Sequence, residues 1–157
     1  MRAENIMVTE LTTAHVNDRV SDVLDRMKMA KLRMLPVVTD EGVVAGVIST
    51  FSIMEHLVPN YIVSGDLNQI PYAPDMGILR RHYFETIGKD LLSVMETKPL
   101  LVKRDESLLS IAAALTAFGK HEYALVVDEE KRLIGVISAG DILDRLGNMI
   151  EGIEDDA

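Results

Sequence analysis

The chain has 157 residues, 48% of them hydrophobic and 26% charged, which suffices for one compact domain or for two small repeats with a shared core. Its 16 basic and 25 acidic residues give a net charge of −9, which opposes binding to nucleic acid. The sequence contains no run of about 18 apolar residues, so a membrane span is not expected. Cysteine is absent, which excludes disulfides and cysteine-based zinc sites. The N-terminal sequence MRAENIMVTE lacks the apolar core of a signal peptide, and we expect a cytoplasmic protein.

The first part of the chain alternates between strand and helix signals. The expected elements are a short strand near residues 12–16, a helix from about residue 20, β-rich runs at 34–38 and 43–48, and a helix from Ser49 or Thr50. Asp18 or Ser21 is the expected cap of the first helix. The turn Asp40-Glu41-Gly42 separates the two β-rich runs.

A segment of different composition, residues 59–89, follows. It holds three of the five prolines, which predict a loop for its first half. Apolar residues then recur at helical spacing, namely Met76, Leu79, Tyr83 and Ile87. Two interpretations remain open for this helix: it covers the side of the protein, or it is a lid or partner-docking element. The cluster Arg80-Arg81-His82 is either a solvated basic face or a contact for phosphates.

The last part of the chain repeats the first. The tetrapeptide Gly46-Val47-Ile48-Ser49 recurs 89 residues further on as Gly135-Val136-Ile137-Ser138, and the same shift aligns residues 35–38 with 124–127. The expected elements are a strand near 100–102, a helix from Ser107 through Phe118, strands at 123–127 and 133–137, and a helix over 139–150. Each copy thus has the order β-α-β-β-α. One copy is too small to bury a good core alone, so we expect the two to pack face to face.

This pattern resembles the CBS domain, named after cystathionine β-synthase. The features that match are Leu35-Pro36-Val37-Val38 and the motif Gly-h-h-Ser/Thr-x-x-Asp, in which h is apolar. The resemblance covers repeat 1 at residues 1–58 and repeat 2 at 90–150, and it leaves out the linker at 59–89 and an acidic tail at 151–157. It implies an α/β (α+β) fold in which two CBS repeats pack with pseudo-two-fold symmetry, as in a Bateman module.

The resemblance also implies a ligand site in a cleft between the repeats, where the Asp of the motif holds an adenosine ribose. Repeat 2 has the complete motif as Gly135, Ser138 and Asp141. An ionised carboxylate accepts both hydrogen bonds that a ribose cis-diol donates. The alternative is that Ser138 and Asp141 only cap the following helix, since Ser-x-x-Asp is close to a capping box. In repeat 1 Ser52 replaces the Asp, which predicts one good site per chain.

Other candidate ligand-binding residues are implied by their place in the family pattern. Thr97, Lys98 and Pro99 match the stretch before the first strand, which lines the base or sugar pocket. Lys120, His121 and Arg33 lie just before strands, where basic residues of the family reach phosphates. The alternative for each is an ordinary surface position.

The predicted function is regulatory binding of an adenine nucleotide or S-adenosylmethionine, for energy or metabolite sensing, with AMP, ADP, ATP and NAD among the candidate ligands. The alternative is a dimerisation or interaction module that binds no ligand. An enzyme is not expected, because the Walker, G-x-G-x-x-G and G-x-S-x-G motifs are absent. The four scattered histidines predict no metal site, and no obligatory cofactor is expected. We expect a homodimer that regulates another protein, which the sequence does not identify.

Overall fold

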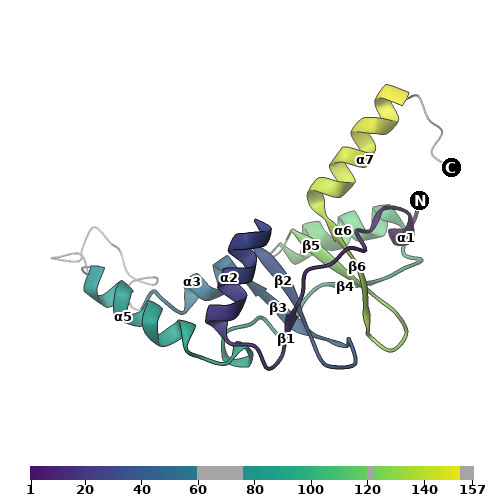
Figure 1. Cartoon of the computed structure of the whole chain (residues 1–157). Helices are drawn as coiled ribbons and strands as arrows, with labels where there is room; N and C mark the ends of the chain where they lie inside the picture. The colour runs from purple at the N-terminus through teal and green to yellow at the C-terminus, as the bar shows by residue number, and fades with distance from the viewer. Residues whose placement is uncertain (60–75, 120–121, 153–157) are drawn as a thin grey trace. The chain divides into compact units, whose positions relative to one another are not determined.

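The computed structural model describes residues 1–59, 76–119 and 122–152 (Figure 1). The chain folds into two compact units, which are described separately below. Unit 1 comprises Met1–Thr12, Val38–Val44 and Lys98–Ala157, and unit 2 comprises Thr13–Val37 and Ala45–Thr97. The predicted mixed α/β fold is confirmed, with two three-stranded sheets and the order β-α-β-β-α in each copy.

Unit 2 is built on a sheet with the strand order β1-β2-β3. Its elements are β1 (Ala14–His15), α2 (Val20–Ala30), β2 (Met34–Val38), β3 (Val44–Ser49), α3 (Thr50–Glu55), α5 (Met76–Ile87) and the 3-10 helix η2 (Leu91–Ser93). The strand β2 lies at the centre of this sheet and is buried at Met34–Val37. The apolar face of α2 packs on it and buries Val20, Val23 and Met27 in the core.

Unit 1 is built on a sheet with the strand order β4-β5-β6. Its elements are α1 (Ala3–Ile6), β4 (Leu101–Lys103), α6 (Leu108–Phe118), β5 (Tyr123–Val127), β6 (Leu133–Ser138) and α7 (Ala139–Gly152). The central strand β5 is parallel to β4 and antiparallel to β6. Ile111 and Leu115 of α6 are buried against this sheet, as the spacing predicts.

Each compact unit also takes in the first residues of the other repeat. The N-terminal helix α1 belongs to unit 1, where the Ala3 N–H donates to the Glu106 carbonyl and the Leu108 N–H to the Met1 carbonyl. In unit 2, η2 is held in the same way, since the Leu91 N–H donates to the Asp18 carbonyl. The boundaries of the sequence repeats and of the compact units therefore differ.

The predicted cap of α2 is wrong. The N-cap is Arg19, which makes no side-chain capping hydrogen bond. The Asp18 carboxylate instead accepts hydrogen bonds from the His15 N–H (2.9 Å) and from the Arg26 guanidinium (3.0 Å). Burial opposes ionisation of Asp18, but these hydrogen bonds and the nearby positive charges outweigh it and hold the pKa below its ordinary value. Asp18 therefore fastens the loop before α2 to the side of that helix.

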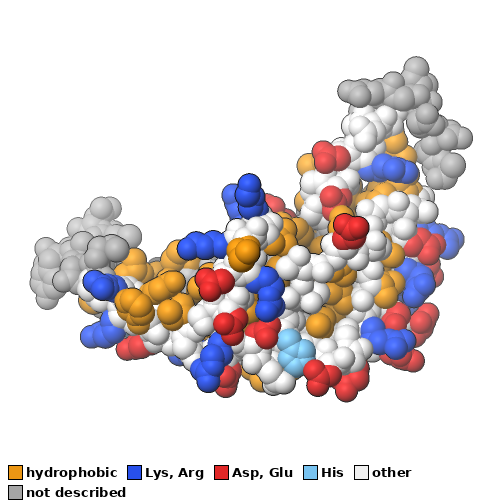
Figure 2. Space-filling model, in the orientation of Figure 1, with side chains coloured by type: hydrophobic (Ala, Val, Ile, Leu, Met, Phe, Trp, Pro, Cys, Tyr) orange, Lys and Arg blue, Asp and Glu red, His pale blue; other side chains and the backbone are white. Residues whose placement is uncertain are grey.

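The predicted linker helix is present as α5, whereas most of the predicted loop, residues 60–75, lies outside the described residues. α5 packs against α2, and Nδ1 of His82 lies 3.1 Å from the Leu57 carbonyl oxygen. Within the predicted apolar stripe Tyr83 is 40% exposed, while Thr86, which is outside the stripe, is buried. Hydrophobic side chains consequently gather on the surface over α5 (Figure 2).

Candidate functional site

The strand order of unit 1 brings the motif of repeat 2 to the same edge of the sheet as the stretch before β4. Tyr123, the first residue of β5, pairs with Ser138, the last residue of β6. On the other side of β5, the Leu125 N–H donates to the Leu100 carbonyl (2.9 Å). The start of β4, the start of β5 and the end of β6 therefore lie together, and α7 begins there with Asp141 in its first turn.

Ser138 and Asp141 are joined by two reciprocal hydrogen bonds. The Ser138 N–H donates to Oδ2 of Asp141 (2.8 Å), and the Asp141 N–H donates to Oγ of Ser138 (3.0 Å). This capping box holds both partly exposed side chains at the start of α7. The predicted cap is thus present, while the question whether Asp141 also binds a ribose stays a prediction. Among the described residues, Oδ1 of Asp141 has no hydrogen-bond partner, so this oxygen keeps its acceptor capacity.

The start of α7 is also tied to β5. The Ala139 N–H donates to the Glu122 carbonyl at 2.8 Å. Unit 2 contains the same connection, in which the Thr50 N–H donates to the Arg33 carbonyl at 2.9 Å. Sequence reasoning missed these backbone contacts, although the 89-residue shift pairs Arg33 with Glu122. Because the contacts use carbonyl groups, the identity of the side chains gives no signal for them.

The corresponding motif of repeat 1 is closed. The Ser52 N–H donates to Oγ of Ser49, and the Ser49 N–H donates to Oγ of Ser52, both at 2.9 Å. The Ser52 hydroxyl also donates to the Ser49 carbonyl (3.0 Å). Both serines are buried, so the hydroxyl of Ser52 has its donor and an acceptor site occupied within the cap.

Gly135 has a packing role in unit 1. A Cβ atom on this residue would lie 2.5 Å from Sδ of Met7, too close for any real side chain. The chain next to Met7 pairs with β6, because the Val8 N–H donates to the Val136 carbonyl and the Val136 N–H to the Val8 carbonyl. The glycine of the motif thus lets the N-terminal stretch approach β6.

The remaining candidate residues do not all fall in one compact unit. Lys98 and Pro99 belong to unit 1 and precede β4 at the edge that carries Ser138. Thr97 and Arg33 belong to unit 2. Lys120 and His121 lie outside the described residues. The structure therefore groups Gly135, Ser138, Asp141, Lys98 and Pro99 in unit 1.

Two further properties concern the described part of the chain, residues 1–59, 76–119 and 122–152. No group of three or more His, Asp or Glu side chains there is arranged to hold a metal ion. None of the helices there has the length and hydropathy that crossing a bilayer requires.

The family model of the CBS domain matches residues 3–59 and 89–148, so the chain belongs to the CBS domain family. It is 26% identical over 157 residues to the uncharacterized protein MJ1426 of Methanocaldococcus jannaschii, with 93% of this chain and 91% of that protein covered. It is 28% identical over 147 residues to the chloroplastic CBS domain-containing protein CBSX2 of Arabidopsis thaliana, and the match covers 89% of this chain and 58% of that protein.

Solved structures with the same fold include two CBS pairs with bound ligands. The structure of CBSX2 in complex with AMP matches with a TM-score of 0.71 at 22% identity and covers 96% of this chain and 98% of that one. The CBS domain pair of protein MJ0100, in complex with 5′-methylthioadenosine and S-adenosyl-L-methionine, matches with a TM-score of 0.68 at 18% identity. That match covers 94% of this chain and 97% of the other.

Proposed function

We propose that this chain is a regulatory CBS pair that binds an adenosine-containing ligand at the edge of the unit 1 sheet where α7 begins. The observation that carries the proposal is the arrangement of Asp141, whose Oδ2 is held by the Ser138 N–H while Oδ1 has no partner among the described residues. A carboxylate that is fixed at one oxygen and open at the other is oriented before the ligand arrives. Less conformational entropy is then lost on binding.

The chemistry of this edge suits a nucleoside. The ribose diol offers two O–H donors, and a partly exposed carboxylate accepts them in charge-assisted hydrogen bonds. Tyr123, the first residue of β5, pairs with Ser138 and offers an aromatic ring for the base, and Pro99, which precedes β4, adds an apolar side chain. The net charge of −9 means that a phosphate would be held by local donors, for which Lys98 is the candidate in unit 1.

The relatives favour an adenosine-containing ligand without selecting one. AMP is bound by CBSX2, and 5′-methylthioadenosine and S-adenosylmethionine are bound by the MJ0100 pair. These ligands share the adenosine moiety and differ in charge at the 5′ position. We therefore assign the shared recognition to Asp141 and Ser138. The choice among AMP, ADP, ATP, NAD and S-adenosylmethionine falls to the residues around the 5′ group.

The test is a thermal-shift screen of the whole chain with those five compounds and 5′-methylthioadenosine. A ligand that binds only the folded state raises the melting temperature by mass action, so a shift that grows with concentration supports the proposal. No shift at about 5 mM of any of the six compounds would contradict it, because a site that weak, with a Kd above about 1 mM, could not sense metabolites. Release of product from any of the nucleotides would instead indicate an enzyme.

A second candidate function is a dimerisation or interaction module that binds no ligand. Large apolar side chains on the helices of unit 1 favour it, since Leu109 of α6 is 82% exposed and Leu143 of α7 is 68% exposed. Such residues are typical of a surface that another protein covers. The closed motif at Ser52 agrees with this alternative for repeat 1. Dimerisation and ligand binding are compatible, and a dimer without any adenosine ligand would identify the second function.

A further inference from the structure

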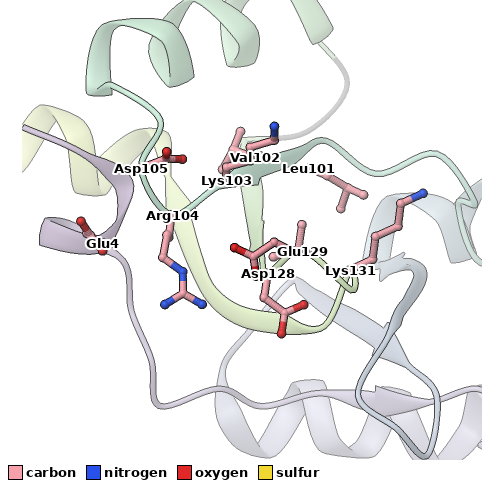
Figure 3. Close-up of a pocket in the computed structure, with 10 residues that line it drawn as sticks. Glu4, Leu101, Val102, Lys103, Arg104, Asp105, Asp128, Glu129 and Lys131 are labelled. Atoms are coloured by element: carbon pink, nitrogen blue, oxygen red, sulfur yellow. The ribbon is translucent and has the colours of Figure 1, made fainter.

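Unit 1 contains a hollow of about 700 Å³ at the opposite edge of its sheet from Asp141 (Figure 3). It lies where the parallel strands β4 and β5 end, whereas Ser138 ends β6 at the other edge. Leu101, 36% exposed, and the nearly buried Val127 lie on the same face of the sheet and form part of its lining. A hollow of this volume is in the range of small-molecule sites.

Charged side chains of both signs surround this apolar lining. They are the cations Lys103, Arg104 and Lys131 and the carboxylates Glu4, Asp105, Asp128 and Glu129. Asp128 is already paired, since its Oδ2 accepts from Nε of Arg132 at 2.9 Å. Of the other six, none forms an ion pair with a described residue. Three basic and three acidic residues thus line one hollow without forming ion pairs with one another.

Arg104 and Glu4 are the two charges whose positions are most closely linked. The Glu4 N–H donates to the Arg104 carbonyl at 3.0 Å, so the two backbones are hydrogen-bonded neighbours. Their side chains nevertheless form no ion pair with each other. In Figure 3 the guanidinium of Arg104 extends between Glu4 on one side and the turn that carries Asp128 and Glu129 on the other. Both residues line the same hollow.

The wall opposite Glu4 is rigid. Lys131 has a φ of 63°, a left-handed conformation that is costly for a residue with a Cβ atom. It is kept there by hydrogen bonds on both sides, as its N–H donates to the Asp128 carbonyl and its carbonyl accepts the Val44 N–H. The Asp128 carboxylate closes the same turn by accepting the Glu130 and Arg132 N–H groups. The backbone of this turn is therefore held in place before any ligand binds.

We propose that this hollow binds a free L-amino acid with an apolar side chain. The guanidinium of Arg104 would bind the α-carboxylate through parallel N–H donors, and Glu4 would accept from the α-ammonium group. The side chain of the amino acid would lie on Leu101 and Val127, which share one face of the sheet. Because α1 supplies Glu4 and the loop after β4 supplies Arg104, such a ligand would fasten the N-terminal stretch to repeat 2.

The experiment is calorimetric titration of the whole chain with L-leucine, L-methionine and L-phenylalanine. Saturable binding of at least one, with a Kd of about 1 mM or tighter, is expected. Two analogues of leucine separate the charges: 4-methylpentanoate lacks the ammonium group, and 3-methylbutylamine lacks the carboxylate. Each should bind at least about tenfold more weakly than leucine, because each leaves one charged group of the hollow without its partner. Equal binding of either analogue, or no binding of the three amino acids at about 20 mM, would overturn the proposal.

Two variants locate the site. R104Q and E4Q should each weaken amino-acid binding at least about tenfold. Both side chains are exposed and form no hydrogen bond or ion pair with a described residue, so the variants should fold as the parent does. R145Q, which removes an exposed cation of α7 outside the hollow, is the matched control and should leave binding unchanged. Unchanged binding in R104Q and E4Q would overturn the assignment.

Testing each variant with the ligand of the other site distinguishes the two proposed sites of unit 1. R104Q should keep the thermal shift produced by an adenosine ligand, and D141N should keep amino-acid binding. Loss of amino-acid binding in D141N would place the amino acid at the α7 edge and overturn the assignment to this hollow. An absent adenosine response with an intact amino-acid response would contradict the proposed nucleotide function and leave this site supported.

Discussion

Ser138 and Asp141 hold each other by two reciprocal hydrogen bonds, of 2.8 and 3.0 Å, at the start of α7. Ser49 and Ser52 form the same pair of bonds at the start of α3, with a third from the Ser52 hydroxyl to the Ser49 carbonyl. Both helices are therefore capped alike. Only the cap of α7 contains a carboxylate, Asp141, whose second oxygen can accept from a ligand. The two repeats therefore differ in their capacity to bind one.

The first prediction concerns Asp141. Asp141→Asn should weaken binding of adenosine ligands by about ten- to a hundredfold, because hydrogen bonds to a charged group contribute roughly 1.5–3 kcal/mol. The amide oxygen of Asn still accepts from the Ser138 N–H, so the free energy of unfolding should change by less than about 1 kcal/mol. Calorimetric titration and urea denaturation of the same samples check the two parts.

Ser52→Ala is the control for this prediction. Nucleotide affinity should stay within a few-fold of the parent, whereas the free energy of unfolding should fall by about 1–3 kcal/mol, because the buried Ser49 N–H loses its partner. Unchanged affinity in Asp141→Asn would mean that the carboxylate is only a cap. A large loss of affinity in Ser52→Ala would place the ligand at repeat 1.

The candidate site could be predicted from sequence only where a side chain carries the chemistry. The spacing of Ser138 and Asp141 suffices to predict both the cap and the carboxylate at the helix start. The contact of the Glu122 carbonyl with the Ala139 N–H gives no such signal, because any residue has a carbonyl group. The hollow near Arg104 was equally hidden, since it joins Glu4 to residues about one hundred positions away and depends on α1, which the hydrophobic pattern does not reveal.

The second prediction tests the packing role of Gly135. Gly135→Ala should lower the free energy of unfolding by about 1–3 kcal/mol, because the new methyl group overlaps Sδ and Cγ of Met7. Gly147→Ala, in an exposed stretch of α7 with no heavy atom near the new methyl group, should instead raise it by about 0.5–1 kcal/mol. Denaturation curves of the two variants give the measurement. Equal effects of the two substitutions would show that Met7 does not pack on β6.

Most of the fold could be predicted from the hydrophobic periodicity and the internal repeat of the sequence. The bounds of β2 and β5 are as predicted, since runs such as Leu35-Pro36-Val37-Val38 are buried in central strands. The sequence could not predict that α1 packs with repeat 2 and η2 with repeat 1, because both helices are short and are held by backbone contacts with distant residues. The cap of α2 was mispredicted because the carboxylate of Asp18 is held by Arg26 instead.

The third prediction follows from the lowered pKa of Asp18. A carboxyl group whose pKa is lower in the folded than in the unfolded chain stabilises the fold above its unfolded pKa, and this contribution is lost as the pH falls through the folded pKa. Asp18→Asn should therefore cost about 1–2 kcal/mol at pH 7, and the difference from the parent should shrink as the pH falls below about 4, the ordinary range of an Asp carboxyl group. Urea denaturation at pH 7, 5 and 3 measures this difference.

The control is Asp25→Asn at an exposed position, which should change the free energy of unfolding by less than about 0.5 kcal/mol at every pH. A cost for Asp18→Asn that persists unchanged at acid pH would mean that the side chain acts by packing rather than by charge.

The fourth prediction is that the exposed leucines of unit 1 make a homodimer interface. Leu143 is 68% exposed and Leu109 is 82% exposed, on the two helices α7 and α6 that contact each other. Leu143→Glu and Leu109→Glu should each weaken self-association by at least about tenfold, because each removes roughly 2 kcal/mol of apolar burial and places a charge in the interface.

The control is Asn148→Glu, which adds the same charge at an exposed position on a different face of α7 from Leu143 and should leave the dimer intact. Light scattering over a micromolar dilution series measures the mass of each form. A monomeric parent chain would contradict the dimer, and a dimer unaffected by both leucine substitutions would move the interface to another surface.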